Sequence, residues 1–285
     1  STNDGATWTA IVESGSRLWT SITTSSDGVY VDATVDNSYI YRSTDSGVSW
    51  TERGEITGVA SSAWTDITMS DNGQYITAVP TGNYIFTSSD FGSNWLSRAN
   101  SGSRNWTSIT SSSDGAKLAA TVDGDYIYTS TSYGEFWSQR VNSGSRNWTS
   151  ITSSSDGTLL AASVANGYVY LSTDSGVTWS PATSLGTGYW KSITSSADGS
   201  RIAVVSDNGG TGEVYVSADT GTTWYQEVAA GAINSQWRSV VFSSSGNKLL
   251  AASSNNYLYT AIDDEAPTIT NVSSNKANGT YTVGE

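Results

Sequence analysis

The chain has 285 residues, with 13 basic and 26 acidic side chains and a net charge of −13. This charge repels nucleic acids and anionic lipids, so it argues against a nucleic-acid partner. The chain contains neither Cys nor His, which removes disulfides, thiolate nucleophiles and the commonest metal ligand. We therefore expect no metal and no cofactor, and any catalysis would depend on carboxylates, Tyr or Lys.

The composition favours a β-protein that does not insert into a membrane. Only 14% of the residues are charged, and Ser, Thr, Gly and Asn dominate the polar remainder, which is typical of a fold with many turns. No run of 18 apolar residues occurs, so we expect no membrane span. Ser1 opens without a signal-peptide pattern, and we expect both ends to be cut from a longer chain.

In chain order, the sequence begins with the octapeptide STNDGATW (1–8) and continues with six repeats of 42–47 residues. Each repeat opens on a Trp in the pattern W-x-[SD]-[IV]. A Ser/Asp/Gly turn, a short β-type run, an Asn/Asp/Gly-rich turn and an aromatic run such as YIY follow. The stretch NSGSRNWTSITSSSDG occurs unchanged at 100–115 and 142–157. The opening residues are Trp19, Trp64, Trp106, Trp148, Trp190 and Trp237.

The repeats predict an all-β fold, a six-bladed β-propeller with four antiparallel strands per blade. Four short runs in each repeat of 40–50 residues are the signature of a propeller blade. Five repeats end in an octapeptide such as STDSGVSW (43–50), whereas the sixth copy lies at the start of the chain, at 1–8. We therefore expect the N-terminal strand, residues 1–13, to complete the last blade and close the ring.

The predicted propeller covers residues 1–265. Its blades are expected at 16–58, 59–102, 103–144, 145–186, 187–231 and 232–262, the last together with 1–13. The remaining segment, 266–285, resembles the start of a bacterial Ig-like or cadherin-like module. This resemblance implies that the propeller is one unit of a large secreted or surface-anchored protein.

The octapeptide S-x-D-x-G-x-x-W resembles the Asp-box, or BNR repeat, of sialidase-like and sortilin-like propellers. Asp45, Asp90, Asp174 and Asp219 occupy its acidic position, where Asn3 and Ser132 stand in the two other copies. A carboxylate there accepts bonds from turn amides, and one carboxylate per turn is too few to hold calcium. We interpret these residues as structural. The resemblance implies that the turns lie on the face opposite the ligand.

Basic and aromatic side chains beside the opening Trp residues are candidate ligand contacts. Three repeats carry an Arg two residues before the Trp, and such a set could bind an anion or an acidic glycan. Alternatively, each Arg stacks on the neighbouring Trp or bridges two blades. The candidate ligand-binding residues are Arg17, Arg104, Asn105, Arg146, Asn147, Tyr189, Lys191 and Arg238.

Two carboxylates depart from the repeat and are weak candidates for catalysis. Asp32 stands at an Ala position and Asp66 at a Ser position of the repeat. On adjacent blades they could form a carboxylate pair for glycoside hydrolysis. They could equally be ion-paired to Lys191 or Arg238, or hydrated.

The sequence favours a non-catalytic extracellular recognition or spacer module of a bacterial surface or secreted protein, such as an adhesin. The sialidase catalytic set is missing, since Arg201-Ile202 is followed by Ala203 and not Pro. Near-identical blades suit multivalent weak binding, so we expect glycans or cell-surface proteins as partners and a monomeric propeller. Two alternatives stay open: a glycoside hydrolase of the Asp-box type, and a purely structural or engineered repeat propeller.

Overall fold

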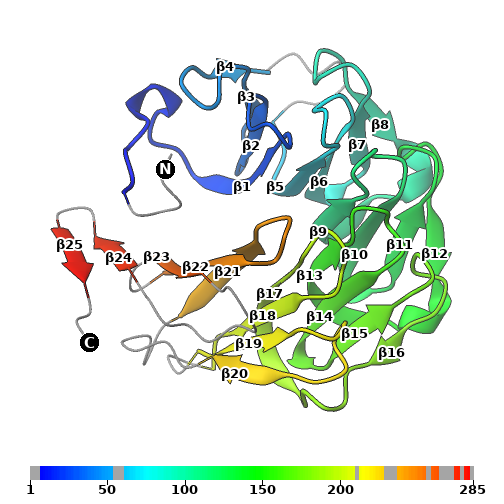
Figure 1. Ribbon diagram of the computed structural model, residues 1–285. Coiled ribbons are helices and arrows are strands. Elements are labelled where there is room, and N and C mark those ends of the chain that lie inside the picture. Colours follow the sequence, from blue (N-terminus) through cyan, green and yellow to red (C-terminus); the bar gives the residue numbers. More distant parts are fainter. Residues whose placement is uncertain are drawn as a thin grey trace.

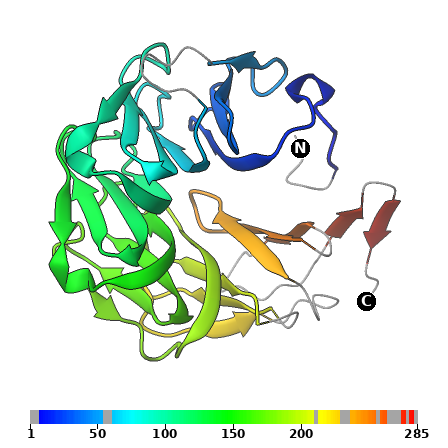
Figure 2. The ribbon, with the colours of Figure 1, turned by 180° about the vertical axis from the view of Figure 1, so that it is seen from behind.

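The computed structural model describes residues 7–53, 61–208, 212–227, 236–254, 258–262, 273–276 and 279–282. Within these residues the chain is almost entirely β-structure, with short 3-10 turns at Val12–Ser14, Ala99–Ser101 and Val141–Ser143. The strands form successive antiparallel meanders arranged around a common centre (Figures 1 and 2). The predicted all-β class is confirmed.

Each sequence repeat folds as one meander, in which every strand pairs with the next. The first contains β1 (Trp19–Thr24), β2 (Val31–Val35), β3 (Ile40–Ser43) and β4 (Thr51–Glu52). The second contains β5 (Trp64–Met69), β6 (Ile76–Asn83), β7 (Ile85–Ser88) and β8 (Leu96–Arg98). The third contains β9 (Arg104–Ser111), β10 (Leu118–Asp125), β11 (Ile127–Ser130) and β12 (Ser138–Arg140).

The remaining meanders follow the same order. The fourth contains β13 (Arg146–Ser153), β14 (Leu160–Gly167), β15 (Val169–Ser172) and β16 (Ser180–Pro181). The fifth contains β17 (Gly188–Ser195), β18 (Ile202–Ser206), β19 (Val214–Ser217) and β20 (Tyr225–Glu227). The sixth contains β21 (Trp237–Phe242), β22 (Lys248–Ser253) and β23 (Leu258–Ile262), and the hairpin β24 (Ser273–Lys276) and β25 (Gly279–Thr282) follows.

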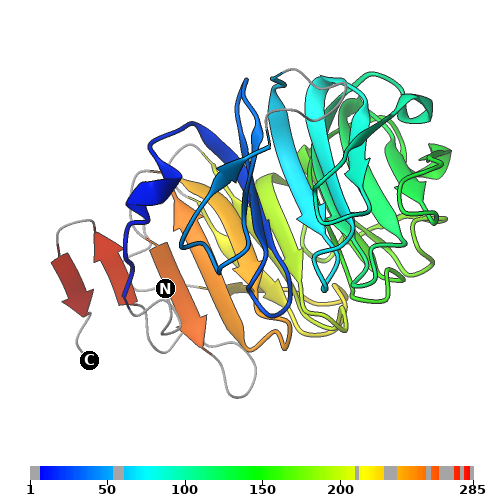
Figure 3. The ribbon, with the colours of Figure 1, turned by 90° about the horizontal axis from the view of Figure 1, so that it is seen from above.

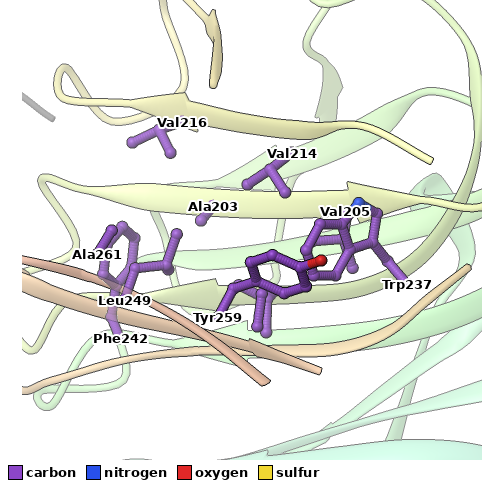
Figure 4. Packing of buried hydrophobic residues seen from close by; sticks show 11 residues of the cluster. Ala203, Val205, Val214, Val216, Trp237, Phe242, Leu249, Tyr259 and Ala261 are labelled. Atoms are coloured by element: carbon purple, nitrogen blue, oxygen red, sulfur yellow. The ribbon is translucent and has the colours of Figure 1, made fainter. Parts of the chain in front are cut away.

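The core lies between meanders, because the first strand of each meander from the second onward buries its apolar face against the preceding meander. At the last of these interfaces, Val205 and Val214 of the fifth meander share a cluster with Trp237 and Phe242 of the sixth (Figure 4). The same arrangement recurs at the other interfaces, for example where Val79 contacts the cluster around Trp106. Five opening Trp residues are 0–2% exposed: Trp64, Trp106, Trp148, Trp190 and Trp237.

A series of backbone hydrogen bonds also joins neighbouring meanders, at the turns between their first and second strands. Each turn donates one amide to the next turn, at N–O distances of 2.7–2.8 Å. The five bonds run from Ser26 to Asp71, from Asp71 to Ser113, from Ser113 to Ser155, from Ser155 to Ala197 and from Ala197 to Ser244. The meanders are therefore held in a fixed order by both packing and polar contacts.

The predicted closure by the N-terminal strand is not confirmed. Residues 7–18 contain no strand, and β24 pairs with β23 through Tyr259 and Ser274. That edge of β23 is the one the N-terminal strand was expected to occupy. Asn3 and the rest of 1–6 lie outside the described residues. The Ig-like module is likewise unconfirmed, since the described part of 266–285 contains the β24–β25 hairpin alone.

We predict that truncating a buried Trp destabilises the protein far more than truncating an exposed aromatic ring. Trp106 is fully buried, whereas Phe136 is 70% exposed. Trp106→Ala should lower the free energy of unfolding by about 3–5 kcal/mol, and Phe136→Ala by less than about 0.5 kcal/mol. Urea unfolding measures both values, and equal effects would contradict the packing described above.

Candidate functional site

Exposed side chains gather on one face of the molecule, where each meander begins. There the hairpin between the second and third strands of one meander pairs with the first strand of the next. The paired positions are Thr81 with Asn105, Asp123 with Asn147, and Ala165 with Tyr189. Asn105 and Asn147 are exposed, and Tyr189 is 52% exposed. We call the surface formed by these six residues the leading-strand face.

The predicted arginines lie at this face, but intramolecular contacts hold their guanidinium groups. Arg104 lies 4.5 Å from the centre of the Tyr128 ring and forms an ion pair with Asp125 at 3.0 Å. Arg146 lies 4.4 Å from the centre of the Tyr170 ring. In both residues Nε also donates to a backbone carbonyl three residues earlier, at 3.0 Å.

Arg17 follows the same pattern in the first meander. Its guanidinium lies 4.3 Å from the centre of the Tyr41 ring and 5.8 Å from that of Trp19, and it donates to the Ser14 carbonyl. One sequence-based interpretation of Arg17 was stacking on the adjacent Trp. The structure shows that the closer ring is a Tyr on the third strand of the same meander, a neighbour that only the β-pairing provides.

The remaining basic candidates are not paired with the two candidate carboxylates. Arg238 lies 3.7 Å from Asp207, through Nη1 and Oδ2. Lys191 is half-buried on β17. Both residues follow their opening Trp directly in the chain, near the start of β17 and β21.

Asp66 is saturated with hydrogen bonds from three strands. Its Oδ1 accepts from the Ser21 hydroxyl at 2.6 Å and from the Ile67 amide at 2.9 Å. Its Oδ2 accepts from the Ser108 hydroxyl at 2.8 Å and from the Ile109 amide at 2.9 Å. The residue is half-buried in surface area, and burial of the carboxylate raises its pKa against these bonds. The carboxylate therefore bridges three meanders.

Serines occupy the equivalent position in later meanders and make a weaker form of the same bridge. The Ile151 amide donates to the Ser108 hydroxyl, and the Ile193 amide to the Ser150 hydroxyl, both at 3.3 Å. Asp66 thus replaces a hydroxyl that already links neighbouring meanders. Its departure from the repeat has a structural explanation.

Asp32 forms a buried ion pair with Arg42, its cross-strand neighbour on β3. The closest atoms are Oδ1 and Nε, 3.6 Å apart, and both side chains are 1–2% exposed. Arg42 also donates to the Gly73 carbonyl at 3.2 Å and lies 5.0 Å from the centre of the Tyr30 ring. Burial raises the pKa of Asp32 to about 7, against the opposing effect of Arg42 and Arg53.

The two aspartates therefore have separate internal partners. Asp32 is enclosed between the first and second meanders, and both oxygens of Asp66 are already bonded. Inverting and retaining glycosidases need a pair of carboxyl groups that face one sugar. This arrangement gives no support to the sequence-based suggestion of an Asp32–Asp66 dyad.

The octapeptide turns share one internal hydrogen-bond pattern. Asp45 accepts from the Ser49 amide at 2.8 Å and the Ser49 hydroxyl at 2.6 Å, which hold its pKa at about 2. The Trp50 indole then donates to the Gly47 carbonyl at 2.9 Å. Asp90, Asp174 and Asp219 accept corresponding bonds. Ser132 accepts a single amide bond, from Phe136 at 3.1 Å.

One concave site was not anticipated from the sequence. A cavity of about 340 Å³ opens on the first meander and is lined by residues that include Ile11, Trp19, Ile22, Ala33 and Trp50. Trp19 is the opening Trp of the first meander. Among the described residues no group of three or more Asp or Glu is placed to hold a metal, and no helix there could cross a membrane.

Comparison with solved structures identifies the fold as a β-propeller. The GH74 xyloglucanase from Xanthomonas campestris matches 92% of this chain with a TM-score of 0.73 and 13% identity. An ancestral GH74 enzyme matches 93% with a TM-score of 0.71 and 16% identity. YCF48 bound to D1 peptide matches 88% with a TM-score of 0.68 and 13% identity.

The likeness at these identities concerns the fold alone. The chain spans 39–48% of the two GH74 chains and 80% of the YCF48 chain. No protein-family model and no curated protein matches the sequence. The neighbours include glycoside hydrolases and a protein bound to a peptide, so the fold does not decide between catalysis and binding.

We predict that Asp66 tolerates replacement by Ser, the residue at this position in the other repeats, but not truncation to Ala. Asp66→Ala leaves the Ile109 amide and two hydroxyls without their acceptor, which should cost about 1–3 kcal/mol of unfolding free energy. Asp66→Ser retains an acceptor for the Ile109 amide and should cost less. Thermal unfolding of the two variants provides the measurement, and the reverse order would contradict the bridging role.

We predict a pH dependence of stability from Asp32. Its folded pKa of about 7 exceeds its ordinary value of 3.8, so the folded state binds the proton more tightly than the unfolded chain. Its stabilising contribution is present below pH 3.8 and is lost as the pH rises through about 7, a change on the order of 4 kcal/mol.

Asp32→Asn removes this titration. The free energy of unfolding of the variant, measured in urea between about pH 5 and pH 8, should change less steeply than that of the wild type. Asp36→Asn is the matched control, because Asp36 follows the same strand, β2, outside the buried pair. Parallel pH profiles for wild type and Asp32→Asn would contradict the raised pKa of Asp32 in the folded state.

Proposed function

We propose that this chain is a non-catalytic recognition or spacer module of a larger extracellular bacterial protein. In this proposal it is a six-bladed propeller completed by its N-terminal strand, and it contacts its partner through the leading-strand face. The observation that carries the proposal is the repetition of one exposed position on three consecutive meanders, at Asn105, Asn147 and Tyr189.

The chemistry of this face suits a hydroxyl-rich or peptide ligand. Asn105 and Asn147 offer amides that both donate and accept hydrogen bonds, and the Tyr189 ring offers an apolar surface with a polar end. Asp123, opposite Asn147, is also exposed. A glycan of a cell surface, or a surface protein, presents matching groups. Weak contacts repeated on one rigid support gain strength through multivalency.

The internal contacts of the arginines change which variants test this proposal. Arg104 and Arg146 stack on Tyr128 and Tyr170, so replacing them alters the meander itself. Asn105, Asn147 and Tyr189 are exposed and can be changed without removing a buried contact. They are therefore the residues whose loss reports on binding.

We predict that the triple variant Asn105→Ala/Asn147→Ala/Tyr189→Ala keeps the wild-type melting temperature and loses at least about tenfold in affinity for its ligand, or about 1.4 kcal/mol. The measurement is a glycan array together with a panel of surface-protein ectodomains, followed by titration of each hit. The control is Phe136→Ala/Val177→Ala, which alters exposed residues of two octapeptide turns at the other end of the meanders.

Each result of this experiment has a definite meaning. Binding that only the triple variant loses supports the leading-strand face. Binding that only the control loses overturns it and moves the contact surface to the octapeptide turns. Failure to bind any glycan or protein overturns recognition and leaves the spacer role.

A glycoside hydrolase is the second candidate, on the single observation that GH74 enzymes share the fold. This chain spans less than half of those chains. Release of reducing sugar from xyloglucan by the purified chain, abolished in Asp66→Asn, would favour this candidate over recognition.

A further inference from the structure

Four aromatic rings lie at the end of the first three meanders where the octapeptide turns are. Tyr30 of the first meander contacts Phe91 of the second, with ring centres 5.4 Å apart. Tyr75 of the second meander contacts Tyr133 of the third, with ring centres 4.3 Å apart. We call these four residues the aromatic row. It lies at the opposite end of the meanders from the leading-strand face.

The two ring pairs are joined through the second meander. The Phe91 amide donates to the Gln74 carbonyl at 3.1 Å, and Gln74 directly precedes Tyr75. The first, second and third meanders follow one another along the arc, in blue, cyan and green in Figure 3. The aromatic row therefore crosses three adjacent meanders.

The two inner rings of the row pack over turns of the next meander. A Cβ atom on Gly73 would lie 2.7 Å from Cδ2 of Tyr30, and one on Gly115 would lie 2.8 Å from Cβ of Tyr75. Both tyrosines are half-buried. The inner rings therefore have a structural role between meanders.

The two outer rings occupy a backbone position that disfavours large side chains. Phe91 and Tyr133 are the fourth residues of their octapeptides and have φ angles of 59° and 53°, in the left-handed region that a bulky residue rarely adopts. Ser46 and Ser175 stand there in the first and fourth meanders. The side chains of Phe91 and Tyr133 are nevertheless 39% and 41% exposed. Internal packing thus uses only part of each outer ring, and the remainder faces solvent.

Carboxylates next to the row are ionised at neutral pH. Asp90 directly precedes Phe91 in its turn. Partial burial opposes ionisation of Asp90, but bonds from the side chain and amide of Asn94 hold its pKa below the ordinary value. A bond from the Ser112 hydroxyl lowers the pKa of Asp114, which is exposed in a turn of the third meander. The outer rings therefore lie in a negatively charged environment.

The row also lacks basic side chains that later meanders carry. At the position of Tyr30 and Tyr75, the third, fifth and sixth meanders have Lys117, Arg201 and Lys248. Asp71 lies in the turn over which Tyr30 packs, and it is exposed. Within the part of the chain that the structure describes, the Asp71 carboxylate has no partner. Aromatic surface and uncompensated negative charge therefore occur together at the row.

One ring of the row already holds a cation on its inner side. The Arg42 guanidinium lies 5.0 Å from the centre of the Tyr30 ring. The Arg42 side chain is 1% exposed, so it cannot pair with a carboxylate at the surface. Aromatic faces attract cations, and carboxylates beside them strengthen the attraction through charged hydrogen bonds. The exposed faces of Phe91 and Tyr133 offer both groups to a cation that arrives from outside.

We infer that the aromatic row is a docking surface for a basic, arginine-rich segment of a partner protein. Its cationic side chains stack on Phe91 and Tyr133 and pair with Asp71, Asp90 and Asp114. The net charge of −13 attracts such a segment from a distance. Arginine binds more tightly than lysine here, because its planar guanidinium both stacks on rings and forms two parallel bonds to a carboxylate. This surface is separate from the leading-strand face, and the inference does not depend on that face.

Replacing the outer rings by the residue of other repeats removes them without changing any charge. The test variant is Phe91→Ser/Tyr133→Ser, which gives both turns the Ser of the first and fourth meanders. The matched control is Leu96→Ser/Phe136→Thr, again with residues of other repeats. It removes two apolar side chains of the same two meanders that are 58% and 70% exposed but lie outside the row.

The measurement is the affinity of labelled hexa-arginine, hexalysine and hexaglutamate peptides for the purified chain, from fluorescence anisotropy at low ionic strength. We expect the wild type to bind hexa-arginine more tightly than hexalysine and not to bind hexaglutamate. The test variant should lose about tenfold in affinity for hexa-arginine, and the control should bind like the wild type. Thermal unfolding should show that both variants remain folded.

A second variant separates stacking from apolar packing. Phe91→Leu/Tyr133→Leu keeps apolar bulk against the inner tyrosines but has no aromatic face. It should lose hexa-arginine affinity as the test variant does. Wild-type affinity in this variant would overturn stacking on the rings.

The other results are equally definite. Failure of the wild type to bind hexa-arginine, or equal affinity of wild type and test variant, overturns the aromatic row. Equal losses in test and control variants overturn it as well. The variant Asn105→Ala/Asn147→Ala/Tyr189→Ala should keep hexa-arginine binding, so failure of the leading-strand face is read separately. Loss of hexa-arginine binding in this variant alone would move the peptide to the leading-strand face and overturn the row.

Discussion

The burial of five opening Trp residues, each against the preceding meander, is the interaction on which the rest of this structure depends. A four-stranded meander has two faces and cannot bury both alone. Stacking the meanders around a centre covers these faces, and four of the Trp indoles, those of Trp64, Trp106, Trp148 and Trp190, also donate to a backbone carbonyl of the preceding meander at 2.8–3.0 Å. Removing apolar surface from water drives this packing, and the indole bond sets its register.

The polar side chains mainly serve the same stacking. Asp66 bridges three meanders, the Asp32–Arg42 pair is enclosed between the first and second, and the arginines near the Trp residues stack on tyrosines of their own meanders. Buried charges persist only when they are paired or bonded. Most residues that look chemically active in the sequence therefore already have internal partners, whereas Asn105, Asn147 and Tyr189 are exposed.

The exposed face of the first meander, where Trp19 is 37% and Ile22 65% exposed, follows from the same principle. In a chain of stacked units, the first and last units each expose one face unless they meet. The apolar character of Trp19 and Ile22 matches that of their buried counterparts and differs from the polar outer face that a terminal unit needs for solubility.

The sequence by itself determined the repeat, the strands within it and the octapeptide turns, because these depend on contacts between residues close in the chain. Ser43, Asp45 and Ser49 satisfy one another within seven residues. Only the tertiary structure decided the partners of Asp32, Asp66 and Arg104, because each depends on which strands pair and which meanders stack. The pattern W-x-[SD]-[IV] predicted six equivalent Trp residues, and stacking made Trp19 the exposed one.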